Sequence, residues 1–198
     1  MGTQVRHRAS RREKLMPGIL MAGVLVIDQL TKLLVVMRIE YTRPPQIAFE
    51  AFGDFFRIIH TRNLGIAFSI GRSLPDAWRS VLFVLLPLLV MAGLGVYYWR
   101  TRELSPLQRW CLAGVMGGGL GNLVDRIFRP EGVVDFLDVR IYGLFGMERW
   151  PTFNVADAAV VVAGILFMVS IIIEDVRRQR RSASDKTLSA PAEKERAE

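Results

Sequence analysis

Four long apolar stretches restrict the folds that this chain can adopt. They cover residues 15–37, 79–99, 107–128 and 153–174. A helix of roughly 20 apolar residues is long enough to cross the hydrocarbon core of a bilayer. The chain is 51% hydrophobic, and its charged residues gather at the ends and in the loops instead of being spread along the sequence. We therefore predict an all-α membrane bundle with four transmembrane helices.

The positions of lysine and arginine predict the orientation of this bundle. Basic side chains are concentrated in residues 1–14, in residues 100–109, and at residues 177–181 directly after the fourth stretch. Short loops rich in lysine and arginine stay in the cytoplasm. Both termini are therefore predicted to be cytoplasmic. The long loops of residues 38–77 and 125–153 are nearly balanced in charge and are predicted to lie outside.

On this pattern the chain divides into three parts. Residues 1–14 form a basic cytoplasmic leader, and residues 15–175 form the four-span domain. Residues 176–198 form a tail that is first basic and then, by its Ser, Ala, Lys and Glu content, disordered. In the two outer loops, residues 55–60 and 132–139 show the alternating, strand-like pattern that predicts β-strands. We expect them to form a small extracytoplasmic β-sheet, a cradle at the membrane surface.

The composition excludes several classes of protein. Cys111 is the single cysteine, so an intramolecular disulfide framework is excluded. The two histidines do not form the HExxH pattern of a zinc protease, and we expect no metal site. The net charge is +7, but the arginines lie beside apolar segments and match no nucleic-acid-binding motif. We therefore expect no nucleic-acid partner.

Charged side chains inside the predicted spans require a reason, because their insertion into a bilayer is costly. Asp28 and Lys32 are four residues apart in the first span and can neutralise each other as a structural ion pair. Near the outer end of the third span, Asn122 lies on one helical face with Asp125 and Arg126. An acid beside an arginine is typical of a pair that orients its neighbours.

The third span also contains two overlapping pairs of glycines, Gly114 with Gly118 and Gly117 with Gly121. Glycines at this spacing let helix backbones approach closely. Helix packing is a sufficient explanation for them.

Two further aspartates differ in their surroundings. Asn154 is a good N-cap for the fourth span, which places Asp157 in the first helical turn, where the helix dipole favours an anion. Asp135 is flanked by apolar residues, and burial there would raise its pKa. A carboxylate and a carboxylic acid together could act as general base and general acid, although the sequence spacing does not establish that they meet.

Four sequence blocks in order resemble the lipoprotein signal peptidases, also called signal peptidase II. The first is DQLTK at residues 28–32, and the second is NLGIAFS at residues 63–69. The third combines GNLVDR at residues 121–126 with VVDF at residues 133–136. The fourth is FNVAD at residues 153–157. The resemblance covers most of the predicted membrane region.

The resemblance implies roles for the polar residues. Asp135 and Asp157 become the catalytic dyad of an intramembrane aspartyl endopeptidase, and Asp28 with Lys32 remains the structural ion pair. Six residues become substrate-binding or supporting residues: Asn63, Gly65, Asn122, Asp125, Arg126 and Asn154. In this interpretation Asp125 pairs with Arg126.

The resemblance also implies a substrate and a location. The substrate would be a prolipoprotein with a diacylglyceryl-modified cysteine, cleaved just before that cysteine. We expect a monomer in the bacterial cytoplasmic (inner) membrane, in contact with phospholipid, with the site near the outer leaflet and no metal or organic cofactor. The first outer loop and the segment near Asp135 would serve as cradle and lid. The stretch of residues 140–150 is long for the family, and Ala158 stands where serine is more usual.

Two other functions are compatible with parts of the sequence. A transporter or proton-relay protein would use Asp28, Lys32, Asp125 and Asp157 as a line of ionisable groups. The nearly uncharged second and fourth spans argue against it. A non-enzymatic scaffold would explain the glycines but would leave Asn122–Asp125 and Asn154–Asp157, two Asn-x-x-Asp segments, without a role.

Overall fold

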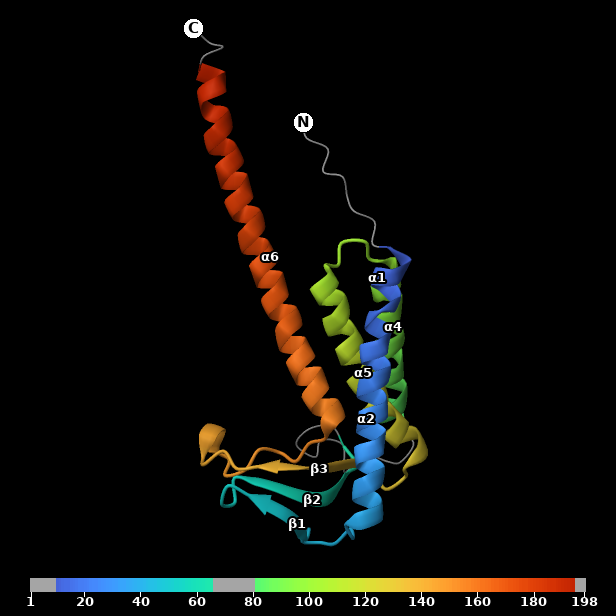
Figure 1. Cartoon of the computed structure of the whole chain (residues 1–198). Coiled ribbons are helices and arrows are strands. Elements are labelled where there is room, and N and C mark those ends of the chain that lie inside the picture. The colour runs from blue at the N-terminus through green and yellow to red at the C-terminus, as the bar shows by residue number, and fades with distance from the viewer. Residues whose placement is uncertain (1–9, 66–80, 195–198) are drawn as a thin grey trace.

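The computed structural model describes residues 10–65 and 81–194, with side chains through Arg180. The helices are α1 (Arg11–Leu15), α2 (Pro17–Arg38), α4 (Leu86–Arg100), α5 (Pro106–Phe128) and α6 (Val155–Lys194). A π-helical turn, η2 (Val81–Leu85), leads into α4, and a short 3-10 turn, η3 (Leu144–Gly146), precedes α6. Figure 1 shows the helices side by side with a small sheet at one end. Helices occupy nearly all of the described parts of the four predicted spans, and α6 begins two residues after the predicted start of the fourth.

Three helical segments among the described residues are long and apolar enough to cross a membrane. They are Arg11–Arg38, Val81–Arg100 and Val155–Arg180. The third predicted span forms a helix, α5, but is less apolar than these three segments because it contains glycines and polar residues. Helix α5 packs against α2, α4 and α6, so protein covers much of its surface. A helix covered in this way can carry polar groups that a lipid-facing helix cannot.

The glycines of α5 permit this close packing. A Cβ atom at Gly117 would lie 2.8 Å from the backbone oxygen of Met21 in α2. A Cβ atom at Gly118 would collide with the backbone oxygen of Ala156 in α6, and at Gly121 it would lie 2.6 Å from Asp28 Oδ2. These glycines therefore have the predicted packing role.

The sheet has the strand order β1-β2-β3 and is antiparallel throughout. Its strands are β1 (Ile47–Ala51), β2 (Phe56–Asn63) and β3 (Val133–Val139). The two predicted strands correspond to β2 and β3, whereas β1 was not predicted. Thr61 pairs with Asp135 and Asn63 with Val133 in the β2–β3 register.

An apolar cluster attaches the sheet to the helices. It contains the buried residues Val35, Val134 and Phe136, with Ile39 and Val155 packed against it. These residues come from the end of α2, from β3 and from the start of α6. The cluster therefore holds β3 beside the first turn of α6 (Figure 1).

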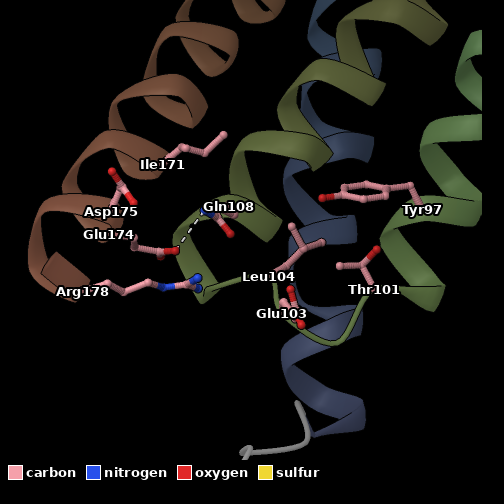
Figure 2. Close-up of a pocket in the computed structure, with 9 residues that line it drawn as sticks. All are labelled: Tyr97, Thr101, Glu103, Leu104, Gln108, Ile171, Glu174, Asp175 and Arg178. Atoms are coloured by element: carbon pink, nitrogen blue, oxygen red, sulfur yellow. Dashed lines mark hydrogen bonds between the residues drawn. The ribbon is translucent and has the colours of Figure 1, made fainter. Parts of the chain in front are cut away.

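At the opposite end of the bundle, a cavity of about 270 Å³ lies between α4, α6 and the start of α5. Gln108 of α5 donates a hydrogen bond to Glu174 of α6 across 3.2 Å (Figure 2). Arg109 is buried and donates to the backbone oxygens of Tyr98 and Thr101, at the C-terminal end of α4. Cations are favourable at that end of a helix dipole. Polar contacts therefore fix the helix ends far from the sheet.

The predicted disorder of the tail is not observed where the tail is described. Helix α6 continues through Lys194, and Figure 1 shows it extending beyond the other helices. Residues 165–190 contain neither glycine nor proline and include many residues with high helix propensity, so the helix of the span can continue. Residues 1–9 of the leader and 195–198 of the tail lie outside the described residues, as do Arg79 and Ser80 of the second predicted span.

The glycine contacts lead to a stability prediction. Gly118→Ala should destabilise the protein by roughly 1–3 kcal/mol, because the added methyl group overpacks the α5–α6 contact. Gly93→Ala is the matched control, because a Cβ atom there has nothing within 4 Å. Unfolding of both variants in detergent micelles measures the difference, and equal stabilities would contradict the packing role.

Candidate active site

The polar residues singled out in the sequence converge where the helices meet the sheet. Asp28 and Lys32 come from α2, and Asn122 and Asp125 from the end of α5. Asn63 ends β2, and Asp135 lies in β3. Asn154 and Asp157 lie at the start of α6. Five segments that are distant in sequence thus contribute to one cluster.

Asp135 is only 3% exposed and is held by two asparagines. Asn154 Nδ2 lies 2.7 Å from Asp135 Oδ1, and Asn63 Nδ2 lies 3.2 Å from Asp135 Oδ2. Thr61, which pairs with Asp135 in the sheet, donates its hydroxyl hydrogen to the Asp135 backbone oxygen across 3.1 Å. Both oxygens of this carboxyl group therefore have a side-chain donor.

Asp157 is half-buried and takes part in the capping of α6. The Asp157 backbone N–H donates to Asn154 Oδ1 across 2.9 Å, and the Asn154 backbone N–H donates to Asp157 Oδ2 across 3.2 Å. This reciprocal arrangement is a capping box, and it bears out the predicted N-cap. Asn122 Nδ2 donates to the other oxygen of Asp157 across 2.7 Å. Asn154 therefore contacts both Asp135 and Asp157.

The two carboxyl groups interact electrostatically. Burial, and after it the negative charge of Asp157, raises the pKa of Asp135 to about 7. Hydrogen bonds from Asn63 and Asn154, and the charge of Lys32, act in the opposite direction without cancelling the rise. The predicted direction of the pKa shift is confirmed. Near neutral pH, Asp135 therefore holds its proton for a substantial part of the time.

A buried ion cluster lies beside these two aspartates. Lys32 Nζ is 2.9 Å from Asp28 Oδ2 and 3.2 Å from Asp125 Oδ2, and all three side chains are fully buried. Lys32 also donates to Asn122 Oδ1 across 2.9 Å. Because Oδ1 is taken by this donor, the Asn122 amide must present its Nδ2 hydrogens to Asp157. The predicted Asp28–Lys32 pair is present, with Asp125 as a third member.

The carboxylates of this cluster also anchor the two segments that carry the aspartate pair. Asp28 Oδ1 accepts the backbone N–H of Ala156, in the first turn of α6, across 2.9 Å. Asp125 Oδ2 accepts the backbone N–H of Val134, in β3, across 3.0 Å. Each anchored residue is the immediate neighbour of one member of the pair. The cluster thus holds in place the backbone next to Asp135 and next to Asp157.

The predicted pairing of Asp125 with Arg126 is wrong. Among the described residues, Asp125 forms ion pairs with Lys32 and with Arg129, one turn further along α5. Consecutive residues on a helix point in different directions, whereas residues four apart share a face. Arg126 instead interacts electrostatically with Asp157, Asp135 and Asp125, most strongly with Asp157.

Three contributors were not singled out in the sequence. Gln29 Nε2 lies 3.1 Å from both Asp28 Oδ2 and Asp125 Oδ1, so it links α2 to α5. Arg129 could have been found from its i+4 spacing to Asp125. Thr61 could not have been found, because its role depends on the register of β2 against β3.

The second sequence block is only partly described. The backbone N–H of Gly65 donates to Asn63 Oδ1 across 3.1 Å, which orients the Asn63 amide so that its Nδ2 faces Asp135. Residues 66–69 of this block lie outside the described residues. Among the residues that are described, no group of three or more His, Cys, Asp or Glu side chains is arranged to hold a metal ion.

Fold and site together define a helical membrane protein with two dissimilar carboxyl groups joined by one asparagine at the end of the helices. The profile of the family described as signal peptidase (SPase) II matches residues 20–173. The chain belongs to the signal peptidase II family and is a peptidase. This assignment decides against the transporter and scaffold alternatives.

Individual relatives agree with the family profile. A lipoprotein signal peptidase of Treponema pallidum is 42% identical over 165 residues, covering 83% of this chain and 87% of that protein. The lipoprotein signal peptidase of Treponema denticola is 41% identical, covering 86% and 96%. The fold is similar to that of a bacterial membrane enzyme solved at 2.3 Å resolution, with a TM-score of 0.67 and 24% identity over 81% of this chain and 89% of that one.

The buried cluster leads to a second prediction. Lys32→Met should destabilise the protein by roughly 3–5 kcal/mol, because it leaves two buried carboxylates without their shared cation. Lys14→Met is the control, since Lys14 lies at the other end of the bundle and contacts a backbone oxygen, that of Trp99. Unfolding in micelles tests this, and comparable stabilities of the two variants would refute the role given to Lys32.

Proposed function

We propose that Asp135 and Asp157 form the catalytic dyad of this peptidase. The observation that carries the proposal is the position of Asn154, which contacts Asp135 through its amide and Asp157 through its backbone and side chain. One residue thereby ties the two carboxyl groups to each other. Asn63, Gly65, Asn122, Asp125 and Arg126 are proposed to support the dyad, and Asp28 with Lys32 to brace it.

The two carboxyl groups have different proposed roles. Asp135 is buried and its pKa is raised to about 7, which suits a general acid. Asp157 lies in the first turn of α6, where backbone N–H groups and the helix dipole favour its anion. We assign Asp157 as the general base.

The chemistry follows from these roles. Asp157 removes a proton from a water molecule, and the water oxygen attacks the carbonyl carbon of the scissile peptide bond. The tetrahedral intermediate collapses, the C–N bond breaks, and Asp135 donates its proton to the departing nitrogen. Transfer of a proton from Asp157 back to Asp135 restores the starting state. One water is consumed, and a carboxyl and an amine product are released.

The proposed substrate is a prolipoprotein whose cysteine carries a diacylglyceryl group, cleaved just before that cysteine. The relatives' name, lipoprotein signal peptidase, supports this choice. A lipid-anchored cysteine is confined to the membrane surface, and the site lies at the ends of apolar helices, where such a cysteine can reach it.

We propose that α5, the third predicted span, also crosses the membrane, which gives four transmembrane helices, and that the enzyme is a monomer in the bacterial inner membrane. The basic residues at both ends of the chain favour cytoplasmic termini. This orientation puts the sheet and the dyad near the outer leaflet, with the sheet as a cradle for the substrate. The loop proposed as a lid includes residues 66–80, which lie outside the described residues.

Substitution of either aspartate tests the dyad. Asp135→Asn and Asp157→Asn should each reduce cleavage of a lipid-modified precursor by at least about 10²–10⁴-fold, because each removes a proton-transfer group. Asp54→Asn is the control, since Asp54 lies in the β1–β2 turn and pairs with surface arginines. Near-normal cleavage by a folded Asp135→Asn or Asp157→Asn variant would overturn the assignment.

The pH dependence tests the role of Asp135. A general acid is active only while protonated, so the rate should fall by about tenfold per unit as pH rises beyond about 7. Asn63→Leu removes a hydrogen bond that lowers the pKa of Asp135 and should move this decline to higher pH. Asp54→Asn should leave it in place. A decline that stayed fixed or moved to lower pH in Asn63→Leu would contradict the acid role.

A further inference from the structure

A second cavity lies beside β2, and neither Asp135 nor Asp157 is among its lining residues. Its volume is about 280 Å³, and it is lined by Tyr41, Thr42, Arg43, Pro45, Thr61 and Arg62. Two of these residues are arginines, and none is an acid. The hydroxyl groups of Thr42 and Thr61 donate to backbone oxygens, which leaves the Tyr41 hydroxyl and the two guanidinium groups as donors for a ligand. The lining therefore favours an anion with several oxygen acceptors.

Arg62, a lining residue of this cavity, has one guanidinium nitrogen that is unsatisfied among the described residues. Its Nη1 atom is buried and has no hydrogen-bond partner in the part of the chain that the structure describes. No ion pair of Arg62 with a described carboxylate is present either. A buried guanidinium nitrogen without an acceptor is costly, and a charged oxygen is its strongest partner.

Arg43 is held at the rim of the same cavity. Its Nε donates to the Tyr41 hydroxyl across 2.6 Å, and its guanidinium lies 5.5 Å from the centre of the Tyr41 ring. These contacts leave its other N–H groups for a ligand. The Tyr41 ring in turn packs against the ring of His60 in β2, which holds Tyr41 in place at the rim.

The cavity lies just beyond the end of a membrane-spanning helix. The apolar segment that contains α2 ends at Arg38, and Tyr41 to Pro45 follow after Ile39 and Glu40. Tyrosine and arginine at this position are typical of the membrane–water interface, where lipid phosphates are the abundant anions. We propose that the Arg43–Arg62 cavity binds a phosphate group, supplied by the headgroup of a membrane phospholipid.

Occupancy of this cavity bears on the candidate active site. Thr61 lines the cavity and also donates to the backbone oxygen of Asp135. Asn63, two residues along β2, holds the Asp135 carboxyl group. A headgroup bound to Arg62 therefore restrains the strand that positions Asp135. This coupling rests on the proposed function, whereas the binding itself does not.

Lipid retention tests the binding. The full chain is purified in detergent, titrated with phosphatidylglycerol, and its bound lipids are counted by native mass spectrometry. The wild type should retain one phosphatidylglycerol that Arg62→Gln and Arg43→Gln bind at least tenfold more weakly. Arg102→Gln removes the same charge from an exposed loop at the other end of the protein and should behave as the wild type. Equal retention by all four proteins would overturn the proposal.

Two further binding experiments identify the source of the phosphate. Diacylglycerol, which lacks a phosphate, should not occupy the site, and binding of it with equal strength would overturn phosphate recognition. Displacement of the lipid by millimolar inorganic phosphate would overturn the lipid source in favour of a free anion. If Arg62→Gln fails to fold, as judged by its melting transition, the exposed Arg43→Gln carries the test.

The lipid site and the catalytic dyad can fail independently. The Asp135→Asn variant should no longer cleave the precursor but should still retain phosphatidylglycerol. The Arg62→Gln variant should no longer retain it. In bilayers of phosphatidylcholine, added phosphatidylglycerol should stimulate the wild type and Arg102→Gln more than Arg62→Gln. Equal stimulation of all three proteins would contradict the proposed coupling between the cavity and Asp135 through Thr61.

Discussion

The position of every catalytic candidate depends on one buried cation. Lys32 is fully buried between Asp28 and Asp125, and its charge is stable there only because both carboxylates accompany it. Each carboxylate also accepts a hydrogen bond from a backbone N–H group: Asp28 accepts one from α6, and Asp125 accepts one from β3. The electrostatic requirement of a single lysine thereby joins three helices and the sheet, and it fixes the first turn of α6 beside β3.

The resulting site makes two chemically identical side chains behave differently. Asp135 lies in a strand, enclosed by asparagines and apolar residues, and its acid form is favoured. Asp157 lies in a helical turn, half-buried, among N–H donors. Lys32 sets the direction of the Asn122 amide, and Gly65 sets that of Asn63. Neutral amides with fixed orientations thus contact both carboxyl groups and give them different environments.

Much of this arrangement was predictable, because local rules govern much of it. Hydropathy located the helices, alternation located β2 and β3, and capping preferences located Asn154. Strand β1 was missed because its side chains are largely exposed and carry no burial pattern. The partner of Asp125 was predicted wrongly, because a cation from α2 reaches it only after α2 and α5 have packed. The tail was predicted as disordered from composition alone, although its residues also favour continuation of a helix.

The length of α6 has a mechanical consequence for the site. The helix has 40 residues, about 60 Å at 1.5 Å per residue, and its N-terminal turn carries Asp157. Only its apolar part, within Val155–Arg180, has to match the hydrocarbon thickness of the bilayer, and a mismatch is accommodated partly by tilt. Because Asn154 caps the helix and also holds Asp135, tilt of α6 acts on the geometry between the two carboxyl groups. We therefore expect the thickness of the host membrane to affect the geometry of the candidate active site.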